Sequence, residues 1–209
     1  STMAMTLPSD FREFLKLLNS NRVEYLLIGG YAVAYYGYPR ATADMDLWIA
    51  VSPANAERAA KALREFGFDV PELTPQTLLA ANKIVRIGLP PMRIELMTGI
   101  SGVSFDECYQ SRTRVEIDGI DVSLISLDDL KAALRAFAAE RDWDQFHSAK
   151  NLAMAISIES AELMEHFQWA SEQQDVALDA RRREMVSDEL ADVFMYTVRL
   201  ADRLGIDLL

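Results

Sequence analysis

Residues 156–169 read "ISIESAELMEHFQW", and this stretch decides how the C-terminal part of the chain folds. Its apolar residues recur with the spacing of an α-helix, yet it carries Glu159, Glu162 and Glu165 at three-residue intervals. Residues three apart on a helix are neighbours on one face, so Glu159 and Glu162 point to the same side. Carboxylates among so many apolar neighbours predict a binding role for this helix. Glu165 is assigned to solvent or to a supporting position.

A second acidic pair follows in "DELADVFMY", residues 188–196. Glu189 and Asp192 have the same helical spacing, and Tyr196 lies one turn beyond Asp192. Two antiparallel helices could bring the four carboxylates of both pairs together, where they would repel one another. Mg²⁺ would offset that repulsion, because it prefers carboxylate, water and phosphate oxygens. The four carboxylates thus predict a Mg²⁺ site that holds a di- or triphosphate and orients a water for attack.

A plainer interpretation exists for each pair taken alone. A glutamate pair at i, i+3 is typical of a solvated helix face, since surface helices are charged by default. Two such pairs on successive helices, each flanked by aromatic and aliphatic residues, favour the metal site over the solvated face.

The composition excludes several classes of function. The 209 residues carry a formal net charge of −11, which argues against general binding of nucleic-acid backbones and of anionic membranes. Cys108 is the single cysteine, so an internal disulfide and a cysteine-based zinc site are excluded. No apolar run approaches the roughly 20 residues that span a bilayer, and the N-terminal "STMAMTLPSD" has no signal-peptide pattern. These features predict a cytoplasmic protein.

The chain changes character near residue 126. The first part mixes helices with strands, including a hairpin over 114–125 that turns at Asp118-Gly119. Beyond it the periodicity predicts helices alone, over residues 126–143, 148–170 and 179–205. We therefore expect two domains: an α/β domain over residues 8–126 with a mixed sheet and helices, and an all-α domain over residues 127–209.

The second domain resembles the MazG-like, all-α nucleoside triphosphate pyrophosphohydrolases, and within them the dCTP pyrophosphatase group. The resemblance rests on "LRAFAAERDWDQFHSAKNLAMAISIESAELMEHFQW" and "DELADVFMYTVRLADRLGIDLL", and it covers about residues 127–209. The family signature is ExxE, a gap, then ExxD, which here is Glu159, Glu162, Glu189 and Asp192.

That resemblance implies hydrolysis of a nucleoside triphosphate, a dNTP in first place, to the monophosphate and pyrophosphate. It also implies Mg²⁺ and a homodimer or a dimer of dimers, in which the helical halves complete one bundle. Family members usually continue past "GIDL" with another helix, so the domain as printed is expected to lack its last helix.

Aromatic side chains near the acidic helices could line a pocket that stacks on a base: Trp143, Phe146, His147 and Trp169. Lys150 and Asn151, at the start of the first acidic helix, could meet phosphate oxygens, and Tyr196 a sugar or phosphate. Structural alternatives stand beside each role. A lone histidine is more often a structural hydrogen bonder, Lys150 and Asn151 could be surface and cap residues, and Tyr196 could be a core residue.

The first part carries its own pattern in "LLIGGYAVAYYGYPRATADMDLWIAV". Gly29 and Gly30 lie between a predicted strand and a predicted helix, where the backbone can approach a phosphate closely. Asp44 and Asp46 alternate along a strand and face the same side. Glu95 on an adjacent strand could supply a third carboxylate. Three carboxylates on a sheet can hold two Mg²⁺ ions for in-line nucleotidyl transfer.

This pattern resembles the minimal nucleotidyltransferase fold over about residues 8–128. The resemblance implies transfer of NMP from an NTP to a hydroxyl acceptor. From the residues themselves, Arg40 or Thr42 could touch phosphate. The pattern departs from the family in two places, because Gly30 replaces a more usual serine and Glu95 a commoner aspartate. A retained fold without transfer activity is the alternative, since a fold does not imply a function.

Three hypotheses follow. The first is a Mg²⁺-dependent nucleoside triphosphate pyrophosphohydrolase fused to a nucleotidyltransferase-like domain. The second is a nucleotidyltransferase whose helical part serves dimerisation. The third is a non-catalytic, nucleotide-binding or antitoxin-like protein.

Overall fold

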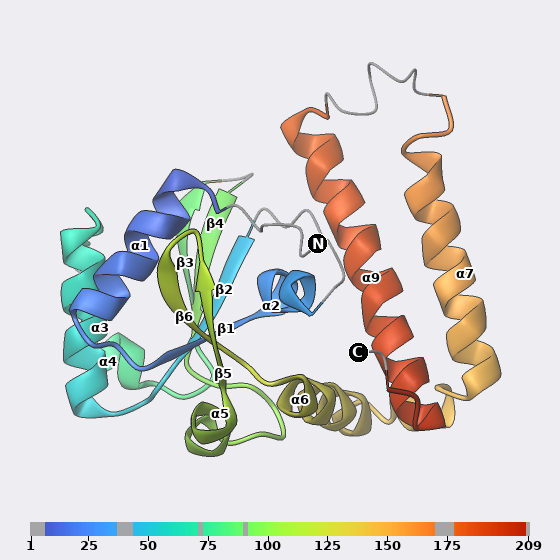
Figure 1. Cartoon of the computed structure of the whole chain (residues 1–209), viewed down its shortest axis with the longest axis horizontal. Coiled ribbons are helices and arrows are strands. Elements are labelled where there is room, and N and C mark those ends of the chain that lie inside the picture. Colours follow the sequence, from blue (N-terminus) through green and yellow to red (C-terminus); the bar gives the residue numbers. More distant parts are fainter. Residues whose placement is uncertain (1–6, 37–43, 71–72, 90–91, 170–177, 208–209) are drawn as a thin grey trace.

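The computed structural model describes residues 7–36, 44–70, 73–89, 92–169 and 178–207 (Figure 1). Arg40 and Thr42, which the sequence links to phosphate, lie outside these ranges. The helices are α1 (Ser9–Ser20), α2 (Gly29–Tyr35), α3 (Pro53–Glu65), α4 (Pro75–Leu79), α5 (Phe105–Ser111), α6 (Leu127–Glu140), the short 3₁₀ helix η1 (Trp143–Gln145), α7 (Ala149–Glu165) and α9 (Ala180–Leu204). The strands are β1 (Tyr25–Ile28), β2 (Asp44–Ile49), β3 (Ile84–Leu89), β4 (Met92–Met97), β5 (Thr113–Ile117) and β6 (Ile120–Leu124).

The six strands form one mixed sheet in the order β3-β4-β2-β1-β6-β5. β1 pairs antiparallel with β2 and parallel with β6, while β2 pairs parallel with β4. The two edge strands, β3 and β5, are each antiparallel to their neighbours. β1 is buried along its whole length, as expected for a central strand covered on both faces. The predicted mixed sheet with helices is confirmed.

The hairpin between β5 and β6 turns where the sequence predicts it. Asp118 and Gly119 both have positive φ angles, of 52° and 73°. That conformation matches the right-handed twist of the flanking strands, and the Asp-Gly pair favours it. The turn also ties down the start of the chain, because the Leu7 backbone N–H donates to an Asp118 carboxylate oxygen at 2.7 Å.

Helix α3 is anchored to the sheet by a buried amide. The Ser52 hydroxyl caps the helix by accepting from the Asn55 backbone N–H. The Asn55 side chain is fully buried; it accepts from the Glu24 N–H at 2.8 Å and donates to the carbonyl oxygens of Glu24 and Ala50 at 3.0 Å each. These bonds join α3 to the ends of β1 and β2.

Two details differ from the sequence-based expectations. Gly29 and Gly30 do not precede the helix but are the first two residues of α2, with Gly29 at φ +60°. Helices α4 and α5 were not predicted, because five and seven residues are too few to show a helical period.

The helical part lies beside the sheet (Figure 1). α7 and α9 run antiparallel to each other. α9 lies nearer the sheet than α7 does, and α2 lies between α9 and the sheet. Val33 of α2 packs with Phe194 and Val198 of α9 in a small buried cluster that Leu130 and Leu134 of α6 extend. The predicted helical character of this part is confirmed for the residues that the structure describes between 127 and 207. Among the described residues, no helix is long and apolar enough to cross a membrane.

Helix α6 contacts both parts of the molecule. Toward the sheet, the Ser111 hydroxyl donates to an Asp129 carboxylate oxygen at 2.5 Å. Toward the helices, Arg135 pairs with Asp202 of α9. α6 begins at Leu127, next to the expected boundary, but it bridges the two parts, so the division into residues 8–126 and 127–209 stays a prediction.

Candidate functional site

The acidic residues are presented by two capped antiparallel helices. The Ser148 hydroxyl accepts from the Asn151 N–H at the start of α7, and an Asp179 carboxylate oxygen accepts from the Arg182 N–H at 2.8 Å at the start of α9. These caps fix where each helix begins. α7 and α9 then lie alongside each other over most of their length, so carboxylates at their middles can meet.

Three carboxylates come together between these helices. Glu159 of α7 and Glu189 and Asp192 of α9 each place a carboxylate oxygen so that the three oxygens lie within 4.8 Å of one another. All three side chains are half-buried. Burial, followed by the charges of Asp192, Glu162 and Glu189, raises the pKa of Glu159 above its usual value. A divalent cation would relieve this repulsion.

Glu162, the fourth acid of the predicted set, lies outside this trio. It is exposed on α7, although its charge is close enough to contribute to the raised pKa of Glu159. Its role as a metal ligand therefore stays a prediction.

Aromatic side chains adjoin the acidic trio through Tyr196. His147 lies between Trp143 and Tyr196, with ring centroids 5.8 Å from the first and 6.2 Å from the second. Burial and the charges of Glu159 and Asp192 raise the pKa of Tyr196, which places this ring beside the carboxylates. Trp143, His147 and Tyr196 thus form one wall that leads from the acidic trio to the loop between α6 and α7.

His147 is held in an environment that disfavours its charged form. Burial, then the positive charge of Arg199, lowers its pKa, while Asp144 acts in the opposite direction. Its Nδ1 atom is buried and finds no hydrogen-bond partner among the described residues. A neutral imidazole has one N–H donor and one acceptor nitrogen.

Four other predicted nucleotide contacts lie apart from this wall or are otherwise engaged. Phe146 is 60% exposed and Trp169 is 87% exposed, so neither lines a pocket within the described chain. The Asn151 side-chain amide donates to the Phe146 carbonyl oxygen at 2.9 Å, which matches the cap alternative. Lys150 is exposed in the first turn of α7. Their contacts with a nucleotide stay predictions.

The predicted carboxylates of the sheet are already paired with arginines. Asp44 accepts from the Arg93 backbone N–H, from its Nε and from its terminal nitrogen at 3.1, 3.2 and 2.8 Å. Glu95 is buried and accepts from the Arg86 Nε at 2.8 Å. Arg93 lies opposite Asp44 on β4, and Arg86 lies opposite Glu95 on β3. A metal ion would compete with the Arg93 guanidinium for both Asp44 oxygens and with the Arg86 guanidinium for Oε1 of Glu95.

Asp46 lies opposite Glu95 in the register of β2 and β4, as the sequence predicts. It also lies against Gly29, where an added Cβ would come within 2.0 Å of the Asp46 Oδ2 atom. Within the described residues, however, the ligand atoms of Asp44, Asp46 and Glu95 do not form a group of the kind that Glu159, Glu189 and Asp192 form.

The comparisons with known proteins match the part of the chain that carries the acidic helices. Residues 154–209 match the sequence model of the MazG-like family. The dCTP pyrophosphatase 1 of Rattus norvegicus is 42% identical over 85 residues, which cover 40% of this chain and 50% of that protein. The C-terminal part of this chain is a MazG-like domain. The chain spans about half the length of the curated relatives it matches.

Two solved structures extend the comparison. The MazG-like domain resembles a pyrophosphatase from Archaeoglobus fulgidus at 41% identity, over 39% of this chain and 76% of that one, with a TM-score of 0.37. A Thermotoga maritima protein described as a "putative nucleotidyltransferase" is 18% identical over 66% of this chain and 91% of its own, with a TM-score of 0.47.

Sequence reasoning missed the charged side chains that surround the site. Arg135, Asp144, Arg199 and Asp202 form a linked set of ion pairs beside the aromatic wall. A faint signal existed, because Tyr196, Arg199 and Asp202 follow one another at three-residue spacing and so share one side of α9.

Proposed function

We propose that the MazG-like domain is a nucleoside triphosphate pyrophosphohydrolase, converting a dNTP and water to the dNMP and pyrophosphate. The observation that carries the proposal is the trio of Glu159, Glu189 and Asp192, whose carboxylate oxygens lie within 4.8 Å of one another. The 42% identity with a dCTP pyrophosphatase supports the same class of substrate.

The donor set fits Mg²⁺. The trio offers oxygen ligands alone, and Mg²⁺ takes one or two carboxylates together with waters and substrate phosphates. When bound, Mg²⁺ would neutralise the carboxylates, polarise a phosphoryl oxygen and lower the pKa of a coordinated water. Glu159, Glu189 and Asp192 would hold it, and Glu162 would be the fourth ligand.

The remaining residues bind and orient the nucleotide. Trp143 and His147 are proposed to face the base, by stacking and by a hydrogen bond from the neutral imidazole. Tyr196 lies between this aromatic pair and the acidic trio, and we propose that its hydroxyl binds the sugar or a phosphate. Binding the base at one end and the phosphates at the other would align the reacting phosphorus with the water.

We also propose that the chain forms a homodimer through α7. Met154 and Ile158, one turn apart on this helix, are 53% and 54% exposed. Figure 1 shows α7 at the outer edge of the molecule, with α9 beside it. A second α7–α9 pair would cover this apolar surface and complete a four-helix arrangement.

Nucleotidyl transfer by the sheet is the second candidate function. Gly29 and Gly30 at the start of α2 support it, because backbone without a side chain can approach a phosphate closely. The pairing of Asp44 with Arg93 and of Glu95 with Arg86 weighs against it. Nucleotide binding without turnover is the third outcome that experiments must separate.

Hydrolysis of dCTP over a Mg²⁺ titration tests the leading proposal. We expect turnover that requires the metal and that falls by about 100-fold or more in Glu189→Gln, since a metal ligand is lost. Asp188→Asn is the matched control, because Asp188 is the adjacent carboxylate on α9 and is exposed. Equal activity in Glu189→Gln and Asp188→Asn would contradict the proposal.

A further inference from the structure

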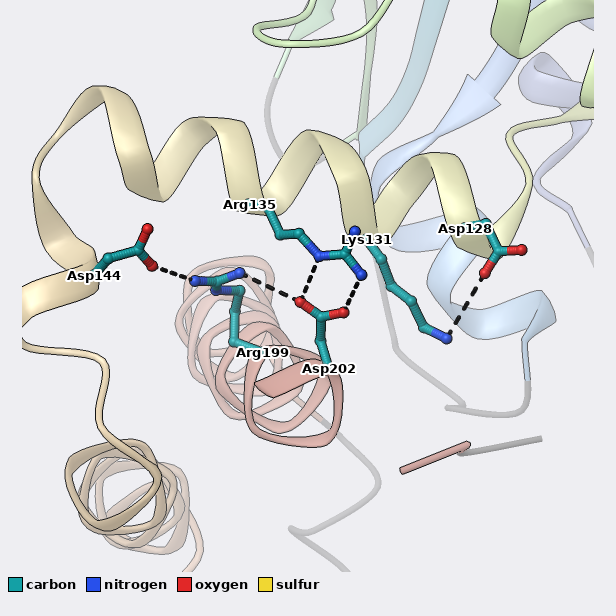
Figure 2. Close-up of polar contacts among 6 residues, drawn as sticks. All are labelled: Asp128, Lys131, Arg135, Asp144, Arg199 and Asp202. Atoms are coloured by element: carbon teal, nitrogen blue, oxygen red, sulfur yellow. Dashed lines mark hydrogen bonds and ion pairs between the residues drawn. The ribbon is translucent and has the colours of Figure 1, made fainter. Parts of the chain in front are cut away.

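A chain of ion pairs joins α6, α9 and the loop before α7 (Figure 2). Arg135 of α6 donates to both carboxylate oxygens of Asp202, through its Nε at 2.7 Å and through a terminal nitrogen. Arg199 lies one turn before Asp202 on α9 and contacts it at 3.5 Å. On its other side, Arg199 donates to Asp144 at 2.8 Å. The charges alternate along the chain, so each carboxylate lies between cations or next to one.

Arg199 and Asp202 are the buried members of this chain, with side chains 9% and 10% exposed. A buried guanidinium is unfavourable unless carboxylates pair with it. Asp202 is largely committed to Arg135, whose hydrogen bonds are the main reason that the pKa of Asp202 is lowered. Asp144 is therefore the closer partner of Arg199, at 2.8 Å against 3.5 Å for Asp202.

Asp144 belongs to the loop that carries the aromatic wall. It is the middle residue of η1 and lies directly after Trp143, and His147 follows within one turn. The amide N–H of His147 donates to the Trp143 carbonyl oxygen at 3.0 Å, so a backbone hydrogen bond closes the turn that contains Asp144. Residues 141–146 of this loop are exposed, and little buried apolar surface holds them in place.

Arg199 lies on α9, the helix that carries Glu189 and Asp192 of the acidic trio. It lies one turn after Tyr196, which in turn lies one turn after Asp192. The ion pair between Arg199 and Asp144 thus joins the loop with the base-facing side chains to the helix with the metal-facing ones.

We propose that the Arg199–Asp144 ion pair positions the α6–α7 loop against α9, and thereby sets how tightly Trp143 and His147 hold the nucleotide. This inference rests on the proposed function. Arg199 and Asp144 are positioning residues, because they act through the loop and touch neither the metal nor the phosphates. Loss of the pair would release the base-binding wall while leaving the acidic trio in place.

Steady-state kinetics with four variants of the full chain test this role. Asp144→Asn should raise KM for the preferred dNTP by about 10-fold and change kcat by less than about 2-fold, since ground-state and transition-state binding are lost together. Asp144→Glu should restore most of the affinity, because the carboxylate is 54% exposed and a longer side chain has room.

Two controls separate positioning from general stability. Arg135→Met removes the link between α6 and Asp202 but leaves the contact of Arg199 with Asp144, so it should lower Tm and leave KM unchanged. Asp128→Asn removes a solvent-exposed carboxylate that pairs with Lys131 at 3.9 Å and should change neither quantity.

Hydrogen–deuterium exchange provides a readout that needs no nucleotide. Backbone amides of residues 143–147 should exchange faster in Asp144→Asn than in the unmodified chain, Arg135→Met or Asp128→Asn. Unchanged exchange in Asp144→Asn, or an active Asp144→Asn variant with an unchanged KM, would overturn the positioning role and leave the proposed function standing. An unmodified chain that neither hydrolyses nor binds a dNTP would overturn the proposed function, and this inference with it.

Discussion

Glu159 and Asp192 lie on different helices, yet their carboxylate oxygens come within 4.8 Å of each other and of Glu189. Burial, and after it the charges of Asp192, Glu162 and Glu189, raise the pKa of Glu159 and so disfavour its ionised state. Neighbouring Tyr196 connects the trio to His147 and Trp143. The cluster of acids thus lies beside an aromatic wall.

Divalent metal should stabilise the fold through the trio. The pKa of Glu159 is raised above its usual 4.5, so the protonated side chain favours the folded state at low pH. This contribution to the free energy of unfolding is lost as the pH rises through the raised pKa. Mg²⁺ should therefore raise Tm more at about pH 8 than at about pH 5, since the ligands must be ionised to bind it. Differential scanning calorimetry of the unmodified chain measures this.

The double variant Glu159→Gln/Glu189→Gln should be more stable than the unmodified chain without metal, and insensitive to Mg²⁺. An equal rise of Tm with Mg²⁺ in both proteins would place the metal elsewhere.

His147 should titrate below the usual histidine value of 6.5, because burial and Arg199 lower its pKa. Arg199→Met should move the pKa upward, and Asp144→Asn should move it further down, since Asp144 favours the charged ring. As the pH is lowered, His147 is protonated in the unfolded chain at a higher pH than in the folded chain. The free energy of unfolding should therefore fall as the pH drops below 6.5. NMR titration of the imidazole Cε1–H signal measures each pKa.

The chain has two histidines, so a His147→Gln variant assigns the signals. A His147 pKa above 6.5 in the unmodified protein would contradict the described environment.

Gly29→Ala should destabilise the sheet part strongly. Gly29 has φ +60°, and an added Cβ would meet the Asp46 carboxylate at 2.0 Å. Gly67→Ala is the matched control, because Gly67 also has a positive φ, of +100°, but open space around it. Gly67→Ala should cost about 1–2 kcal/mol from backbone strain, and Gly29→Ala about 1–3 kcal/mol more from overpacking. Urea denaturation measures the free energy of unfolding of each variant. Equal losses in the two variants would contradict the predicted clash between the Cβ added at position 29 and the Asp46 carboxylate.

The exposed apolar surface of α7 should mediate dimerisation. Light scattering should give the unmodified protein twice the 23.5 kDa mass of one chain. The double variant Met154→Asp/Ile158→Asp should be a monomer, because charges would be buried in the contact. Ile84→Asp, at a 49% exposed position on edge strand β3, is the control and should leave the dimer intact. A dimer that survives the α7 substitutions would contradict this interface.

Local signals predict the longer helices, the Asp-Gly hairpin and the acidic residues, because caps, turns and periodicity act over a few positions, whereas the short helices α4 and α5 give no such signal. Glu162 shows the limit of such reasoning. Residues three apart on a helix differ by about 60° in direction, so Glu159 can face α9 while Glu162 stays exposed.

The partners of Asp44 and Arg199 required the three-dimensional structure. Asp44 meets Arg93 because β2 and β4 pair in parallel, a register that joins residues 44 and 93 and that no local pattern encodes. Arg199 meets Asp144 because α9 packs beside the α6–α7 loop. Long-range pairing of this kind depends on how elements pack, which composition and spacing do not specify.

The products formed from a nucleoside triphosphate distinguish hydrolysis by the helical part from nucleotidyl transfer by the sheet. The unmodified chain, Glu159→Ala/Glu189→Ala and Asp44→Ala/Asp46→Ala would each be incubated with Mg²⁺ and the common dNTPs and NTPs, and the products separated by chromatography. We predict free dNMP and pyrophosphate from the unmodified chain and the Asp44/Asp46 variant, and neither from the Glu159/Glu189 variant. Absence of hydrolysis by the unmodified chain, or NMP attached to an acceptor and lost in the Asp44/Asp46 variant, would contradict the account.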